Sequence, residues 1–155
     1  MLEYSKLFLL FVTCLFILLA LFKLRRKNIP RNVCGFLLSS LFLTLFLVII
    51  IEIKPHHFLR NTISISNLIT YFFYFAFVGL YFIKNVQIII QNKYLLLITT
   101  FMLFGLANAV DLLSDGKLIR FMNNEIIEDI FHNLGTVFWL LFFVDYLKRI
   151  RIKYL

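Results

Sequence analysis

The chain has 155 residues; 62% of them are hydrophobic, only 15% are charged, and the net charge is +8. A soluble domain of this length could not cover so much apolar surface with so few charged side chains. The composition therefore excludes a soluble globular protein and indicates an integral membrane protein with no room for a separate soluble domain.

Five hydrophobic segments follow one another along the chain, each close to the roughly 20 residues that cross the hydrocarbon of a bilayer. They are predicted as helices at residues 7–22, 33–53, 63–83, 94–113 and 128–147. Runs such as Phe46–Ile51 lack the alternation of a β-barrel strand. The first segment is predicted to be a retained helix, because its basic cluster follows it and no cleavage site is visible. The predicted fold is all-α, a polytopic membrane bundle of about five helices in one domain.

The basic residues predict the orientation of this bundle. In a five-span chain the first loop, the third loop and the C-terminus share one side, and that side holds most of the 16 Lys and Arg residues. Cytoplasmic loops carry such an excess, so we expect the N-terminus outside and the C-terminus inside, in the bacterial cytoplasmic membrane. The basic inner face is predicted to comprise Arg25, Arg26, Lys27, Lys148 and Arg149.

The net charge therefore needs no nucleic-acid partner, since the basic inner face and its contacts with anionic lipid account for it. One acid, Asp145, is predicted on that face, where Lys148 or Arg149 can pair with it at helical spacing. The other acids and all three histidines are predicted at the outer face.

The start of the last predicted helix, EIIEDIFHNLGTVFW, is the densest group of outer titratable residues. Glu128, Asp129 and His132 have helical spacing, and Asp129 with His132 has the i,i+3 separation of metal ligands in helix bundles. Asp111 and Asp115 are expected at the same depth on the preceding helix. These five residues are candidates for a ligand site or for a switch that titrates near neutral pH.

A simpler interpretation of the same residues is also open. The acids can stabilise the positive N-terminal end of the last helix. A hydrogen bond to Asp111 or to a backbone carbonyl can satisfy His132, which lies inside an apolar stretch where ionisable groups face the bundle interior. Whether a metal binds here is undetermined, and no cofactor is expected.

A second polar set lies on the middle helices. Asn67, Tyr71 and Tyr74 form one helical stripe, and Asn108 is the polar side chain on the inner stretch of the next predicted helix. Such a seam lines a pore or a ligand pocket, or it supplies interhelical hydrogen bonds of about 0.6 kcal/mol each. Gly35, four residues before a serine, and Gly135 are predicted to allow close helix approach.

The motifs of nucleotide-binding, hydrolytic and redox enzymes are missing, so the sequence predicts a protein that is not an enzyme. The leading hypothesis is a small membrane subunit, a sensor or scaffold that couples the outer acidic–histidine face to a partner at the basic inner face. Bacterial stress and phage-defence systems use proteins of this class. The alternatives are an oligomeric channel or transporter and an accessory packing subunit. The expected partners are the lipid bilayer and either another protein or further copies of the chain.

Overall fold

The computed structural model describes residues 2–25, 30–53, 67–115 and 124–154, and these ranges contain helices and no strand. The helices are α1 (Leu2–Arg25), α2 (Arg31–Ile53), α4 (Asn67–Ile90), α5 (Tyr94–Asp115) and α6 (Asn124–Tyr154). All five are long and apolar enough to cross a membrane. The predicted all-α membrane fold with five spans is therefore confirmed.

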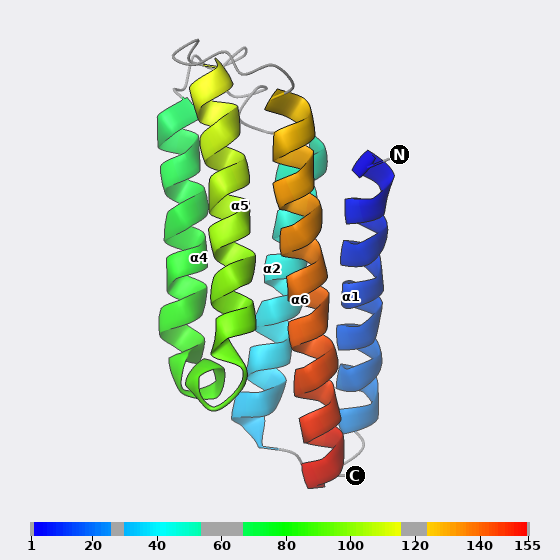
Figure 1. Cartoon of the computed structure of the whole chain (residues 1–155). Helices are drawn as coiled ribbons and strands as arrows, with labels where there is room; N and C mark the ends of the chain where they lie inside the picture. The colour runs from blue at the N-terminus through cyan, green and yellow to red at the C-terminus, as the bar shows by residue number, and fades with distance from the viewer. Residues whose placement is uncertain (1, 26–29, 54–66, 116–123, 155) are drawn as a thin grey trace.

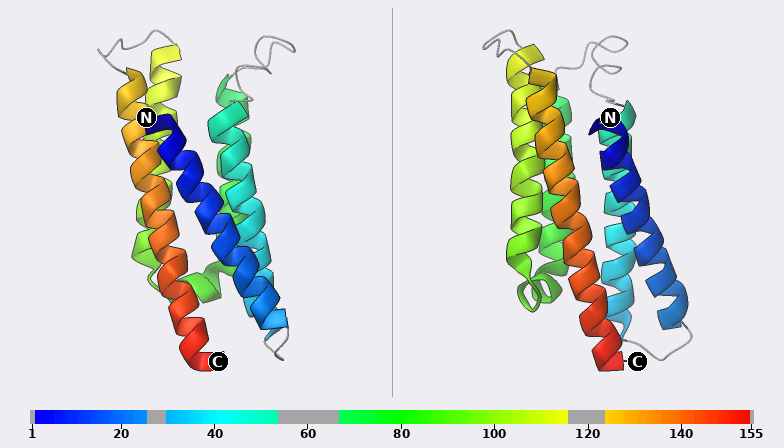
Figure 2. Two further views of the ribbon diagram at one scale, coloured as in Figure 1. Left: turned by 90° about the vertical axis from the view of Figure 1, so that its right-hand side faces the viewer. Right: turned by 45° about the vertical axis from the view of Figure 1, so that its right-hand side comes forward.

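The five helices stand side by side and alternate in direction along the chain (Figure 1). We call the end where α1 and α6 begin the upper end, and the end where α6 finishes the lower end, as in that view. Helix α6 packs most extensively against α5 and then against α1. Helix α1 crosses the bundle obliquely: its start lies beside α6, and its last turns lie beside the start of α2 (Figure 2).

The helices are longer than the apolar runs that predicted them, and α4 is one example. This helix continues to Ile90, so Lys84 and Asn85 lie in helix, where the sequence predicted a loop from residue 84. Asn85 is buried; its Nδ2 donates to the Tyr81 carbonyl oxygen at 2.8 Å and to Ser39 Oγ at 3.2 Å. Because polar side chains are satisfied in this way inside the bundle, they do not end the helix.

Helix α6 also exceeds its prediction at both ends. Its 31 residues, at a rise of about 1.5 Å each, make it about 46 Å long. The hydrocarbon core of a bilayer is only about 30 Å thick. The helix therefore reaches beyond the apolar layer.

The core is built around the single tryptophan, Trp139 of α6, which is fully buried. Its indole Nε1 donates to Thr44 Oγ1 of α2 at 3.0 Å, so the polar atom of the ring is satisfied. Its ring meets Phe143 edge-on at a centroid distance of 4.9 Å and Phe101 of α5 at 5.5 Å. Tyr81 of α4 lies at 6.4 Å, so one side chain connects four helices.

Close packing of α5 on α6 depends on Gly135. A Cβ atom at this position would lie 2.8 Å from the ring of Phe104 and 3.3 Å from the Thr100 carbonyl oxygen. The predicted close approach at Gly135 is confirmed. The prediction for Gly35 is wrong, because a Cβ there would meet no atom within 4 Å.

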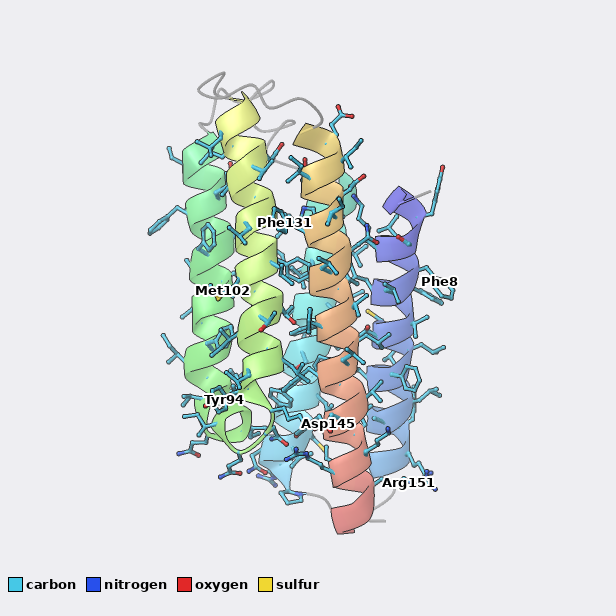
Figure 3. All side chains as sticks on the ribbon, viewed as in Figure 1. Phe8, Tyr94, Met102, Phe131, Asp145 and Arg151 are labelled. Atoms are coloured by element: carbon cyan, nitrogen blue, oxygen red, sulfur yellow. The ribbon has the colours of Figure 1, made fainter. Side chains whose placement is uncertain are left out.

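Large apolar side chains cover the outside of the bundle on every helix. Examples are Phe8, Phe42, Phe72, Met102 and Leu141. Figure 3 shows Phe8 extending away from α1. Such a surface is unfavourable in water and suits the acyl chains of lipids, so the chain is an integral membrane protein.

Candidate functional site

The acidic and histidine residues of α6 gather at the upper end of the bundle. The helix begins at Asn124, four residues before the predicted start, so only Glu125 lies in its first turn, and that residue is exposed. Glu128 and His132 are buried, and Asp129 is partly buried. Glu125 can therefore stabilise the positive N-terminal end of the helix, as the simpler interpretation holds. Glu128, Asp129 and His132 instead contact neighbouring groups.

Asp129 faces α1, where it forms an ion pair with Lys6. The Lys6 Nζ and Asp129 Oδ1 atoms are 2.5 Å apart, and Lys6 is only 5% exposed. One turn further along α6, the Asn133 side-chain oxygen accepts a hydrogen bond from Ser5 of α1. The start of α1 is thus attached to α6 by a buried charge pair and a neighbouring hydrogen bond.

Sequence reasoning missed the role of Lys6. No partner for this lysine was predicted from the sequence. The available signal was a lone lysine just inside an apolar helix, because a charge in that position needs an opposite charge nearby.

His132 lies next to Glu128. Its Nε2 is 3.7 Å from Glu128 Oε1, one helical turn away, so the two form an ion pair when the imidazole is protonated. On the other side the imidazole ring lies 5.9 Å from the Phe104 ring. The Nδ1 atom is buried and has no hydrogen-bond partner among the residues that the structure describes. Glu128 thus lies beside the imidazole of its own helix, whereas Asp129 pairs with Lys6 of α1.

Asp111 of α5 is buried and accepts a hydrogen bond from the Tyr71 hydroxyl of α4. Tyr71 in turn meets Tyr74 edge-on, with ring centroids 5.7 Å apart. Two predicted sets, the acidic candidates and the polar seam, therefore meet at one interhelical contact. Asn67 begins α4 and Asp115 ends α5, but their side chains lie outside the described part of the structure.

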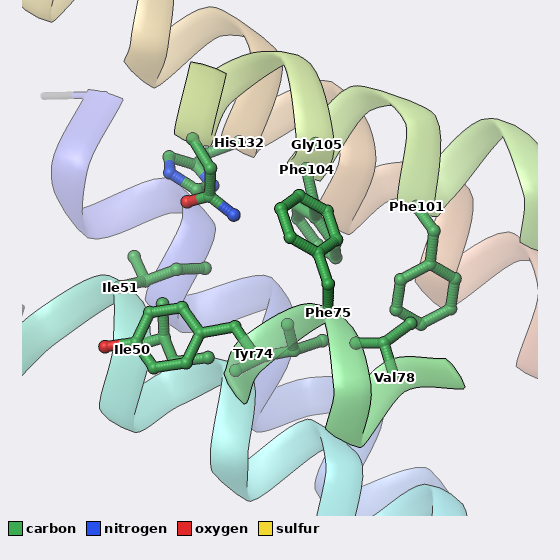
Figure 4. A pocket seen from close by; sticks show the side chains of 11 residues that line it. Ile50, Ile51, Tyr74, Phe75, Val78, Phe101, Phe104, Gly105 and His132 are labelled. Carbon is green, nitrogen blue, oxygen red and sulfur yellow. The ribbon is translucent and has the colours of Figure 1, made fainter. Parts of the chain in front are cut away.

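A small cavity of about 60 Å³ lies between α2, α4, α5 and α6 (Figure 4). His132, Asn108 and Tyr74 contribute its polar groups, and the rest of the wall is apolar. A space of this size holds a few water molecules, which could hydrogen-bond to the buried imidazole. Within the described residues no three His, Cys, Asp or Glu side chains cluster as metal ligands would.

The lower end of the bundle carries a second charge cluster. Asp145 lies 2.9 Å from Arg149 on the same helix and 3.0 Å from Lys93 in the turn before α5. The predicted pairing with Arg149 is confirmed, and the second cation is Lys93, which sequence reasoning left in a loop. Lys148 is exposed.

The rest of the predicted basic face is described only in part. Arg25 is the last residue of α1, and its side chain lies outside the described part of the structure. Arg26 and Lys27 lie outside the described residues altogether.

Comparison with known proteins identifies a protein family that matches this chain. The model described as "Domain of unknown function (DUF8692)" matches residues 55–146, a range that holds α4, α5 and most of α6. No curated protein and no solved structure matches the chain. The matched range includes Asp111, His132 and Asp145, whereas Lys6 precedes it. Because the match covers more than half of the 155 residues, the chain belongs to the family of this domain of unknown function, DUF8692.

Proposed function

We propose that the protein is a non-catalytic membrane subunit, a sensor or scaffold in which α6 couples charged groups at its upper end to a partner at its lower end. One observation carries the proposal. A single uninterrupted helix holds Asp129 and His132 in buried contacts near one end and Asp145 with Arg149 near the other. A signal that changes the upper contacts therefore acts on the same rigid element that presents the lower charges.

The upper contacts are suited to respond to charge. A buried ion pair is stable only while both partners keep their charges, because one buried charge left alone is strongly unfavourable. A ligand, proton or partner that alters Asp129 or its surroundings would loosen the start of α1 from α6. Small shifts of packed helices are a common form of switching, since packed interfaces adopt discrete arrangements.

The lower end is proposed to face the cytoplasm, in a bacterial cytoplasmic membrane. The support is the basic character of this end, where Arg31, Lys84, Lys148 and Arg151 are exposed. Reporter fusions after Leu155 and within the segment around Pro55 test it. They should report opposite sides of the membrane, with the C-terminal fusion inside. Reporters on the same side would refute the five-span orientation and, with it, the proposed coupling.

Co-purification from native membranes tests the coupling itself. Wild-type protein should retain a stoichiometric partner. His132→Ala should change the amount retained, while Glu125→Gln, at an exposed position of the same helix end, should not. His132→Gln keeps a hydrogen-bonding side chain without a titratable charge. Full retention with Gln assigns His132 a structural role, and full retention with both substitutions would refute its part in sensing.

A channel or transporter is the rival function. It has less support, because the cavity beside His132 has a volume of only about 60 Å³ and a mostly apolar wall. Solute flux would require a path between several copies of the chain. Flux of ions or small solutes into proteoliposomes that contain the purified protein would favour this rival over the sensor.

A further inference from the structure

A wide apolar groove runs along the bundle surface between α2 and α4. Its volume is about 750 Å³, within the range of about 300–1,000 Å³ that is usual for small-molecule sites. The apolar wall is formed by Leu38, Phe42, Leu45, Ile49, Phe77 and Leu80, all of which are partly exposed. The groove is therefore open to the lipid side of the bundle.

The groove continues into a polar pocket at the lower end. This pocket has a volume of about 210 Å³, and Gly35 and Lys84 line both spaces. Its polar wall consists of the side chains of Asn32, Asn85, Gln87 and Gln91. One continuous site thus has an apolar part within the span and a polar part near the helix ends.

Local packing explains why the groove stays open. Helices α2 and α4 are held together by polar contacts near their lower ends, where Ser40 Oγ and Tyr81 Oη are 2.8 Å apart and Asn85 bonds to Ser39. Beside these contacts Gly35 has no side chain, and a Cβ there would meet no atom within 4 Å. The helices are therefore joined along one line, and the space next to it remains unfilled.

Lys84 supplies the charge of the site. It is exposed, and none of the carboxylates in the described part of the chain pairs with it. Its Cα lies six residues before the end of α4, about 9 Å along the helix axis. A lysine at this depth extends its ammonium group toward the interface, where lipid phosphates lie.

We propose that this groove binds a phospholipid with an anionic headgroup. One acyl chain would lie along the apolar wall, and the phosphate would contact Lys84 and the amide groups of Asn32, Gln87 and Gln91, since both N–H donors of Asn85 already bond to Tyr81 and Ser39. From Gly35 to Ile49 the groove spans about 21 Å of α2. One leaflet of hydrocarbon is about 15 Å deep, so the groove can hold a chain whose headgroup stays at the interface.

A second copy of the chain is the competing occupant. It would cover the same apolar wall, but the carboxylate that the described residues place at its lower end, Asp145, is already paired with Lys93 and Arg149. Charge complementarity and the continuity of the apolar and polar parts favour the phospholipid.

Native mass spectrometry of the full chain tests the proposal. The protein is released from micelles that contain equal amounts of phosphatidylglycerol and phosphatidylcholine. Wild-type protein should retain phosphatidylglycerol in preference to phosphatidylcholine. Gly35→Leu places a side chain in the open space of the groove and should abolish this retention. Lys84→Gln should weaken the retention of phosphatidylglycerol about fivefold, or about 1 kcal/mol for one basic residue, without affecting phosphatidylcholine.

Two controls accompany these variants. Gly35→Ala adds only a Cβ atom that meets nothing, and Arg151→Gln removes one exposed charge from the same end of the bundle on α6. Both should retain phosphatidylglycerol as the wild type does. Equal retention of the two lipids, unchanged in Lys84→Gln, would overturn the proposal in favour of nonspecific annular lipid. Dimers that disappear in Gly35→Leu, without any lipid adduct, would overturn it in favour of a second copy.

Discussion

The ion pair between Lys6 and Asp129 gives the most direct test of how the bundle is held together. Asp129→Asn removes the negative charge and leaves the Lys6 ammonium, whose side chain is only 6% exposed, without its counter-charge. Lys6→Met leaves the Asp129 carboxylate without its counter-charge. This side chain is 19% exposed and is therefore less completely desolvated than Lys6. We therefore expect both single variants to be destabilised, and Asp129→Asn more than Lys6→Met.

The magnitude follows from the geometry of the pair. At 2.5 Å and an effective dielectric constant of about 20, the attraction is about 7 kcal/mol. Desolvation of the two charges, several kcal/mol for each, offsets most of it. Removal of one partner leaves the desolvation uncompensated and costs about 3–5 kcal/mol, whereas removal of both is close to neutral. For a chain of 155 residues the single loss corresponds to a fall in Tm of about 6–20 °C.

Thermal unfolding in detergent measures these losses, with the emission of the buried Trp139 as the signal. Lys6→Met, Asp129→Asn and the double variant form a double-mutant cycle that isolates the pair. Lys23→Gln is the matched control, because this lysine of α1 is exposed and its loss should stay within about 0.5 kcal/mol. The reasoning fails if both single variants lie within about 1 kcal/mol of wild type, or if the double variant is less stable than either.

Three other substitutions test separate contacts by the same measurement. Gly135→Ala forces a methyl group against a buried aromatic ring and should cost about 1–3 kcal/mol. Gly79→Ala is the control, because a Cβ there meets no atom, and it should leave Tm unchanged or raise it. Equal effects of the two substitutions would contradict the packing argument. Tyr71→Phe removes the hydrogen bond to the buried Asp111 and should cost about 1–3 kcal/mol. A neutral result would show that this hydrogen bond does not stabilise the bundle. Lys93→Gln breaks an exposed ion pair and should cost less than about 1 kcal/mol, so a larger loss would show that the lower charge cluster is structural.

Which charged side chains pair with one another could not be predicted from the sequence. Spacing allowed either Asp129 or Glu128 to approach His132; in the structure Glu128 does so, whereas Asp129 pairs with Lys6 of α1. Lys93 and Asp145 are far apart in the chain, and no periodic pattern relates them. The α2–α4 groove was likewise invisible, because it is a space between helices that no residue type marks.

What the sequence determined by itself is the class of the protein and the number of its spans. In hydrocarbon every backbone N–H and C=O group must be satisfied within the protein, so long apolar runs have to be helices wherever they pack. Tertiary structure alone decided which face of each helix is buried. Apolar residues cover both sides of α2: Leu37 is fully buried, and its neighbour Leu38 is half exposed to lipid. Lipid and protein interior are equally apolar, so hydrophobicity does not distinguish the two faces, and the choice depends on side-chain packing and a few polar contacts.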